Sequence, residues 1–356
     1  MQNFCVFTYG YSIDIIGAQF IIIASNLEGG YWMSTTTNTM KGGLTASKKK
    51  KKLPLHERFV MALKRDYQIW ILLLPAIIFF IVFHYLPLYG IQIAFKDYKA
   101  VQGIVGSKWV GLKHFQDFFN TYYSTRLIAN TFLLNFYNLI WGFPVPVILA
   151  ILLNQFANSG FKRFAQTMIY VPHFISTIVM AGILYLFLSP SNGLVNHLIV
   201  ALGGQPIFFM NEAPWFRTLF IGSGVWQHSG WSAILYIATL TGIDQGIYEA
   251  ATIDGANKRQ KIWYIDVPHL IPIVVMILIL NCGSLLASNT DKALAMQQAG
   301  NMSKSDIIGV YVYTQGLGKA QFSYTAAIGL TINLVNFAMI VTVNWISKRL
   351  GETSLF

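Results

Sequence analysis

The sequence predicts an all-α, polytopic membrane protein with six transmembrane helices, and three observations lead to this prediction. Hydrophobic residues make up 54% of the 356-residue chain, and charged residues make up only 11%. Several apolar runs approach the roughly twenty residues that a helix needs to cross a bilayer. Basic residues gather beside these runs, as in the cytoplasmic loops of membrane proteins. The net charge of +11 therefore reflects membrane topology, and neither nucleic-acid binding nor a soluble domain is indicated.

The first 66 residues differ in character from the rest of the chain. The apolar patch at residues 13–24 is too short and interrupted to span a membrane, and it lacks the basic residues and cleavage site of a signal peptide. We expect residues 1–66 to be a largely disordered cytoplasmic tail, with residues 1–32 upstream of the true start. The run Lys48 to Lys52 is interpreted as a topology anchor near anionic lipid rather than a specific binding motif.

Six apolar segments follow and form a transmembrane domain at residues 67–347. Their approximate limits are residues 68–86, 128–153, 168–188, 216–240, 270–287 and 324–346. If both termini are inside, the cytoplasmic segments hold most of the 25 Lys and Arg residues. We therefore expect a multi-pass protein of the cytoplasmic membrane, with a cytoplasmic C-terminal tail at residues 348–356.

The last long polar segment and the two cysteines are two further features of the sequence. The polar segment from Ser288 to Phe322 either forms short helices over the outer mouth or is an exposed connection, and the sequence leaves both open. Cys5 and Cys282 are far apart and have no histidines at metal-ligand spacing. Neither a disulfide framework nor a metal site is indicated.

A polar segment at residues 241–272 separates two apolar runs. Glu249, Ala250 and Ala251 favour a short helix, Asp244 is a suitable N-cap, and Gly255 is placed to end the helix in a left-handed conformation. Alanines beside a single carboxylate give a smooth surface that can dock into a groove of another protein. The basic cluster that follows places this surface in the cytoplasm.

Two prolines follow this basic cluster. Pro268 and Pro272 fit the first turn of the next helix, because a proline there lacks only an N–H that has no partner within the helix.

The spacing of Glu249-Ala250-Ala251, Gly255 and Pro268 resembles the EAA loop of ATP-binding-cassette (ABC) importer permeases. In that family the loop is a coupling helix seated in a cleft of the cytoplasmic ATPase. The resemblance implies a type I ABC importer permease fold, with residues Glu249, Ala250, Ala251, Asp254 and Gly255 coupling to the ATPase. Asp244 departs from the family pattern, in which Pro is frequent. An ordinary cytoplasmic loop is the alternative interpretation.

Further motifs resemble the permeases that import oligosaccharides released from xylan, pectin and alginate, and the similarity covers the chain from about Lys64 onward. These motifs are Leu86 to Gly90, Ala94 to Tyr98, Trp109 to Phe115 and Lys348 to Glu352. The resemblance implies a heterodimer with a second homologous permease, two ATPase subunits that bind ATP and Mg²⁺, and an extracytoplasmic solute-binding protein. The chain itself would be a non-catalytic transport subunit without a cofactor.

The predicted spans lack the groups that other transport mechanisms need. None has an Asp, Glu, Lys or Arg in its central part, although ion-coupled carriers usually bind their coupling ion through such groups. The chain has no phosphate-binding loop and no catalytic constellation within the spans. The driving force must therefore come from outside this chain, and the partner ATPase that the resemblance implies fits this requirement. The alternative is an ion-independent carrier or channel acting alone.

Neutral polar and aromatic side chains within the spans suit a saccharide path, because amides bond hydroxyls and aromatic faces meet sugar C–H surfaces. The candidate lining residues are Asn135, Asn138, Trp226, Gln227, His228, Trp231, Asn281 and Ser284. The alternative for each is a structural hydrogen bond between helices. His228 in particular is interpreted as a neutral, bonded histidine.

Basic residues dominate the segments expected outside. They are Lys96, Lys99, Lys108, Lys113, Arg126, Arg217, Lys292, Lys304 and Lys319. Such a surface attracts anions, so the expected substrate is an acidic, uronate-containing oligosaccharide such as one derived from alginate or pectin, and a neutral oligosaccharide is the second choice.

Overall fold

The computed structural model describes residues 65, 67–156, 159–287 and 289–349. The predictions for the tail at residues 1–66, apart from Arg65, and for residues 350–356 lie outside this range. The chain divides into two compact units, Met1–Gly90 and Ile91–Phe356.

The described part of the first unit is a long apolar helix. Its parts are α3 (Tyr67–Phe80), a π-helical turn (Ile81–Tyr85) and α4 (Leu86–Leu88). A 3₁₀ segment (Tyr89–Phe95) continues it to a total of 29 residues. The Leu86 N–H bonds to the carbonyl of Ile81, five residues back, directly before Pro87 breaks the backbone ladder. The first predicted span is confirmed as a helix.

The second unit begins with a small hairpin. Strand β1 (Lys96–Asp97) pairs antiparallel with β2 (Lys108–Trp109), placing Lys96 opposite Trp109, and α5 (Gly103–Gly106) lies between them. Helix α6 (Lys113–Asn120) follows and packs beside α19 (Phe322–Arg349).

The second and sixth predicted spans are single long helices. Helices α7 (Ser124–Gly142) and α8 (Pro144–Asn154) together form a 31-residue apolar segment. Pro144 stands at the start of α8, where its missing N–H costs little. Helix α19 has 28 residues.

The third predicted span is sharply bent and is not one straight helix. Helices α9 (Ser159–Tyr170) and α10 (Thr177–Leu188) meet at 97° across a 3₁₀ turn (Val171–Phe174). Pro172 lacks the N–H that would continue the ladder, and the Ser176 hydroxyl caps α10 by accepting from the Val179 N–H at 3.3 Å.

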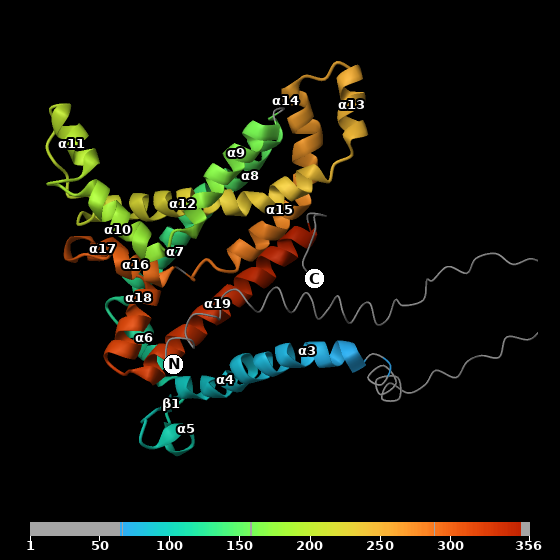
Figure 1. Cartoon of the computed structure of the whole chain (residues 1–356). Coiled ribbons are helices and arrows are strands. Elements are labelled where there is room, and N and C mark those ends of the chain that lie inside the picture. Colours follow the sequence, from blue (N-terminus) through green and yellow to red (C-terminus); the bar gives the residue numbers. More distant parts are fainter. Residues whose placement is uncertain (1–64, 66, 157–158, 288, 350–356) are drawn as a thin grey trace, which may run out of the picture. The chain divides into compact units, whose positions relative to one another are not determined.

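Helix α12 (Ala213–Thr241), which follows α11 (Leu194–Ala201), is the centre of the second unit. One end contributes Phe216 and Phe220 to a core shared with α7, α10, and helices α16 (Thr290–Met296) and α18 (Ile308–Tyr313). The other end contributes Ala233 and Leu240 to a second core with α8. Figure 1 shows α12 crossing the middle of the second unit.

The fifth predicted span begins earlier than expected. Asn257 caps α14 (Lys258–Lys261), a π turn (Ile262–Asp266) follows, and α15 (Val267–Cys282) completes a 25-residue helix. Pro268 stands in the first turn of α15, as the sequence predicts, whereas Pro272 lies inside α15, which corrects the prediction for that residue. The π turn directly before Pro268 replaces the usual bonding pattern, with the Val267 N–H bonding to the Ile262 carbonyl.

The polar segment after α15 forms short helices, which was the first of the two alternatives that the sequence left open. They are α16, α17 (Met302–Ser305), α18, a 3₁₀ turn (Ala299–Asn301) and a π turn (Thr314–Gly318). Buried side chains such as Met296, Asn301 and Ile307 show that the segment is packed and is not an exposed connection.

Fewer than six helices in the described residues are both long enough and apolar enough to cross a membrane. Four helices in the described ranges are long and apolar enough to cross a membrane, or five if the bent α9 and α10 pair counts as one span. Helix α12 is long enough, at 29 residues, but is not among them. Its mean hydropathy is lowered by three polar residues near its middle, Gln227, His228 and Ser229.

Candidate coupling helix and transport path

Helix α13 (Gln245–Ile253) has the boundaries that the sequence predicts. The Asp244 carboxylate accepts from the Gly246 N–H at 2.9 Å and caps the first turn. At the other end the Ala256 N–H bonds to the Ala251 carbonyl at 2.9 Å and the Gly255 N–H bonds to that of Thr252 at 3.1 Å. Gly255 has φ +79°, so this is a Schellman ending that needs the left-handed conformation.

One face of α13 is fixed to the protein. Tyr248 and Ala251 pack on the core formed by the ends of α8, α12 and α15. The Tyr248 hydroxyl donates to the carboxylate of Asp266, which is 0% exposed, and Gln155 Nε2 donates to the other oxygen at 2.9 Å. Burial and this hydrogen bond raise the pKa of Tyr248, so its hydroxyl keeps its proton.

The opposite face of α13 is open. Each helical residue turns about 100° from the one before, so Glu249 and Ala250 point away from the face that carries Tyr248 and Ala251. Both are exposed, and Ile253, one turn beyond Glu249, is 87% exposed. This open face is defined by Glu249, Ala250 and Ile253. Sequence reasoning missed Ile253, although its spacing of four from Glu249 was available.

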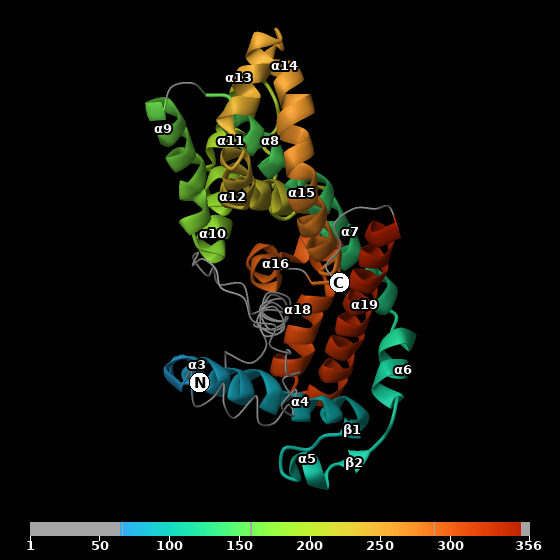
Figure 2. The same ribbon diagram turned by 90° about the vertical axis from the view of Figure 1, so that its right-hand side faces the viewer.

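Helices α13 and α14 form a hairpin at one end of the second unit. Figures 1 and 2 both show them side by side, with α6 and the β1 and β2 hairpin at the other end. Lys261 Nζ donates to Thr252 Oγ1 at 2.7 Å across this hairpin. A reciprocal pair of bonds between Asn257 and Gln260 caps α14. The hairpin is thus held at both helix ends and through Asp266.

Three predicted path residues of α12 gather against the bend between α9 and α10. Gln227 is buried and its Nε2 donates to the Ile175 carbonyl at 2.6 Å. His228 Nδ1 lies 3.2 Å from His173 Nδ1, and Trp231 stacks on the His173 ring at 4.5 Å between centroids. His228 and Trp231 are exposed. Sequence reasoning missed His173, which lies 55 residues away.

The remaining predicted path residues are dispersed. Trp226 is exposed and lies on the opposite side of α12 from His228, two residues away. Asn135 donates to the carbonyls of Thr131 and Leu285 at 3.0 and 2.9 Å. Asn138 is exposed.

The two predicted path residues near the end of α15 bond locally. Asn281 donates to the carbonyl of Ile277, one turn earlier on α15, at 2.9 Å, and Ser284 donates to the carbonyl of Asn281 at 3.0 Å. These bonds, like those of Asn135, tie helices together or close a helical turn.

Several basic residues predicted to face outside are engaged within the protein. Arg126 pairs with Asp306 at 2.8 Å, and Arg217 donates to Asn130 Oδ1 at 3.0 Å. Lys292 is only 4% exposed and donates to the Phe220 carbonyl at 2.7 Å, and burial lowers its pKa to about 8. Lys99, Lys108, Lys113 and Lys319 remain exposed.

No metal centre is indicated in the described part of the chain. It contains no group of three or more His, Cys, Asp or Glu side chains that could hold an ion.

The comparisons with known proteins identify the family. Residues 125–352 match the family described as binding-protein-dependent transport system inner membrane component. The chain belongs to this family. Its members are non-catalytic permease subunits of ABC transporters, and a separate ATPase hydrolyses ATP. The predicted all-α permease fold and the non-catalytic role are confirmed, and the carrier acting alone is set aside.

Two relatives from Bacillus subtilis (strain 168) are similar over most of the chain. Protein LplB is 39% identical over 298 residues, which are 84% of this chain and 94% of LplB. YteP, a polygalacturonan/rhamnogalacturonan transport system permease protein, is 38% identical over 300 residues, again 84% of this chain and 94% of YteP.

Solved structures of an alginate transporter are also similar. A bacterial ABC transporter involved in the import of the acidic polysaccharide alginate has a chain with TM-score 0.76 and 33% identity, covering 82% of this chain and 99% of that one. A second structure shows a bacterial alginate ABC transporter in complex with an alginate pentasaccharide-bound periplasmic protein.

Proposed function

We propose that this permease imports acidic, uronate-containing oligosaccharides across the cytoplasmic membrane. The observation that carries the proposal is the similarity, at 33% identity over 82% of the chain, to a transporter for the acidic polysaccharide alginate. The relative YteP is named for polygalacturonan, which is also an acidic polymer. Alginate and pectin fragments are therefore the first candidates.

The chemistry of α12 supports this substrate class. His173 and His228 lie beside the exposed face of Trp231, which combines imidazole donors for a carboxylate with an aromatic surface for a sugar ring. Lys292 Nζ approaches α12 at Gly224, one helical turn before His228. Trp226, Gln227, Asn135, Asn138, Asn281 and Ser284 are proposed to complete or support the path.

Import requires partners that act with this chain. We place both termini and α13 in the cytoplasm, with six spans in the assembled protein, of which α12 and the bent α9 and α10 pair are two. The partners are a second homologous permease, two ATPase subunits that bind ATP and Mg²⁺, and an extracytoplasmic solute-binding protein. Residues 241–272 form the coupling loop. The residues that couple it to the ATPase are Glu249, Ala250, Ala251, Asp254 and Gly255.

The test is ATP hydrolysis by the assembled transporter in lipid. Uronate oligosaccharides of alginate and pectin are supplied with the solute-binding protein, and neutral xylo- and arabino-oligosaccharides serve as matched controls. Stimulation by the uronate set alone is expected. If only the neutral set stimulated hydrolysis, the acidic assignment would be wrong.

A further inference from the structure

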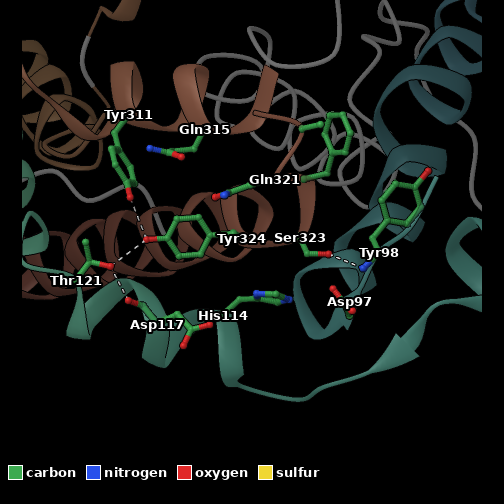
Figure 3. Close-up of a pocket in the computed structure, with 12 residues that line it drawn as sticks. Asp97, Tyr98, His114, Asp117, Thr121, Tyr311, Gln315, Gln321, Ser323 and Tyr324 are labelled. Atoms are coloured by element: carbon green, nitrogen blue, oxygen red, sulfur yellow. Dashed lines mark hydrogen bonds between the residues drawn. The ribbon is translucent and has the colours of Figure 1, made fainter. Parts of the chain in front are cut away.

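A polar pocket of about 550 Å³ lies at the end of the second unit opposite α13. Its walls come from β1, α6, the π turn after α18 and the start of α19 (Figure 3). The lining residues include Asp97, Asp117, Gln315, Gln321, Tyr311 and Tyr324. Its volume falls within the range of about 300–1,000 Å³ that is usual for small-molecule sites. None of the predicted path residues lines it.

The floor of the pocket is a fixed chain of hydroxyls. The Tyr311 and Tyr324 hydroxyls lie 3.3 Å apart, and Tyr324 lies 3.3 Å from Thr121 Oγ1, which donates to the Asp117 carbonyl at 2.7 Å. Tyr311 and Tyr324 also pack on the core of α6, α7 and α19. Burial and the bond to Tyr324 raise the pKa of Tyr311, so its hydroxyl stays protonated. The floor is therefore preorganised.

The rim of the pocket carries uncommitted polar groups. Among the described residues, the carboxylates of Asp97 and Asp117 and the amides of Gln315 and Gln321 have no hydrogen-bond or ion-pair partner. Figure 3 shows the two amides on the side of the π turn and α19, and the carboxylates on the side of β1 and α6. Acceptors and donors thus face one another across the pocket.

An aromatic edge completes the pocket. The rings of Tyr98 and Phe322 meet edge to face at 6.2 Å between centroids. The Tyr98 N–H donates to Ser323 Oγ at 2.9 Å, which fixes the backbone beside this edge. Aromatic surface beside mixed donors and acceptors suits a ligand with an apolar ring surface and hydroxyls around it.

The charges and polar groups of the pocket exclude anions, metal ions and purely apolar ligands. The carboxylates of Asp97 and Asp117 outnumber the one imidazole of the lining, His114, whose Nε2 is already bonded to the Lys96 carbonyl, so a uronate residue is disfavoured. A metal ion lacks the three carboxylate, imidazole or thiol ligands that the described residues would have to bring together. A purely apolar ligand would leave the rim groups without partners.

We propose that this pocket binds a neutral, hydroxyl-rich sugar residue. The inference rests on the proposed function in taking a saccharide as the ligand, and it adds a second site, separate from the proposed path, that takes a neutral residue of a sugar chain. In the proposed orientation the pocket opens on the outer side. Asp97 and Asp117 accept hydroxyl protons, Gln315 and Gln321 donate and accept, and the aromatic edge meets the ring.

The test uses the assembled transporter in nanodiscs without ATP, with saturation-transfer NMR as the measurement. The probes are the neutral methyl glycosides of glucose, galactose and mannose, each paired with its methyl uronide. We expect at least one neutral glycoside to bind and its uronide to bind at least about tenfold more weakly. Asp117→Asn and Gln321→Ala should each weaken neutral binding about tenfold, since Asn replaces one acceptor oxygen with an NH2 donor and Ala removes the amide.

Gln116→Ala is the matched control, because Gln116 is exposed on α6 but does not line the pocket. It should leave binding unchanged. Equal binding of glycoside and uronide would overturn the proposal, as would binding that survives both pocket substitutions. Absence of glycoside binding combined with weaker capture of the solute-binding protein by Asp117→Asn would assign the pocket to a basic side chain of that partner instead. Failure of uronate oligosaccharides to stimulate ATP hydrolysis concerns the proposed function and is a separate result.

Discussion

The Tyr248 hydroxyl donates a hydrogen bond to the fully buried carboxylate of Asp266. Tyr248 belongs to α13, and Asp266 belongs to the helix that leads from the hairpin into the membrane. Gln155, at the end of α8, donates to the other carboxylate oxygen. One buried carboxylate therefore joins α13 to two apolar helices. We predict that a displacement of α13 is transmitted to both.

Loss of this bond should loosen α13. Tyr248→Phe leaves a buried carboxylate oxygen without its donor, at a cost of about 1–3 kcal/mol. We expect a lower melting temperature of the purified complex and less transport per ATP hydrolysed. Tyr264→Phe is the matched control, because Tyr264 lies on the same hairpin but is 80% exposed. Equal effects of the two substitutions would contradict the role of Asp266 as an anchor.

The close approach of α9 to α12 depends on Gly230. A Cβ at this position would lie 2.1 Å from the Ile169 carbonyl oxygen, so Gly230→Ala must push the backbones apart. We expect poor folding, measured as loss of monodisperse protein after solubilisation. Gly222→Ala on the same helix meets no atom within 4 Å and should be neutral or slightly stabilising. Normal folding of Gly230→Ala would show that this contact is not tight.

The stability contribution of Lys292 should depend on pH. Burial lowers its pKa from 10.5 to about 8, so the buried charge is costly below pH 8 and this cost disappears as the pH rises toward 10.5. Lys292→Met should therefore be more stable than the wild type at pH 7, by on the order of 3 kcal/mol at most.

This advantage should shrink between pH 8 and 10.5, as measured by thermal unfolding of both proteins at each pH. Lys113→Met, at an exposed lysine, should show no such trend. A constant difference between Lys292→Met and the wild type over this range would mean that Lys292 is not neutralised.

The end of α13 requires the left-handed backbone conformation at position 255. Gly255→Val places a β-branched residue at φ +79°, whereas Gly255→Asn is tolerated in this conformation. We expect Val to reduce substrate-stimulated ATP hydrolysis strongly and Asn to reduce it little, with both proteins inserted normally. Similar activities of the Val and Asn variants would show that the Schellman ending is not needed for coupling.

The sequence predicts local features of this protein well. Asp244 and Gly255 act through their immediate neighbours, so cap and stop signals place both ends of α13. Helix period and hydropathy likewise locate α7, α8 and α19. The sequence alone does not show that Pro172 and Ser176 would turn the third span through 97°. A proline within an apolar run is compatible with a kink, a break or an unbroken helix.

Contacts between distant segments were beyond sequence reasoning. The stacking of His173 on Trp231 joins residues on two helices, and nothing in the spacing of either helix indicates it. Lys292 was expected on the outer surface because lysines are usually exposed, but the carbonyl of Phe220 and the packing of α16 bury it. The Asp266 anchor was missed because the predicted fifth span began after it.

We propose that the open face of α13 transmits ATPase closure to the permease. The most direct measurement of this role is substrate-stimulated ATP hydrolysis by the assembled transporter carrying Glu249→Lys. Glu212→Lys is the control, because Glu212 is exposed and makes no capping hydrogen bond at the start of α12. We expect Glu249→Lys to insert normally and to lose stimulation by at least about tenfold, since it reverses the one charge of the open face, which we propose pairs with a cationic side chain of the ATPase. A Glu249→Lys transporter that assembles and hydrolyses ATP at the stimulated rate of the wild type would contradict the account.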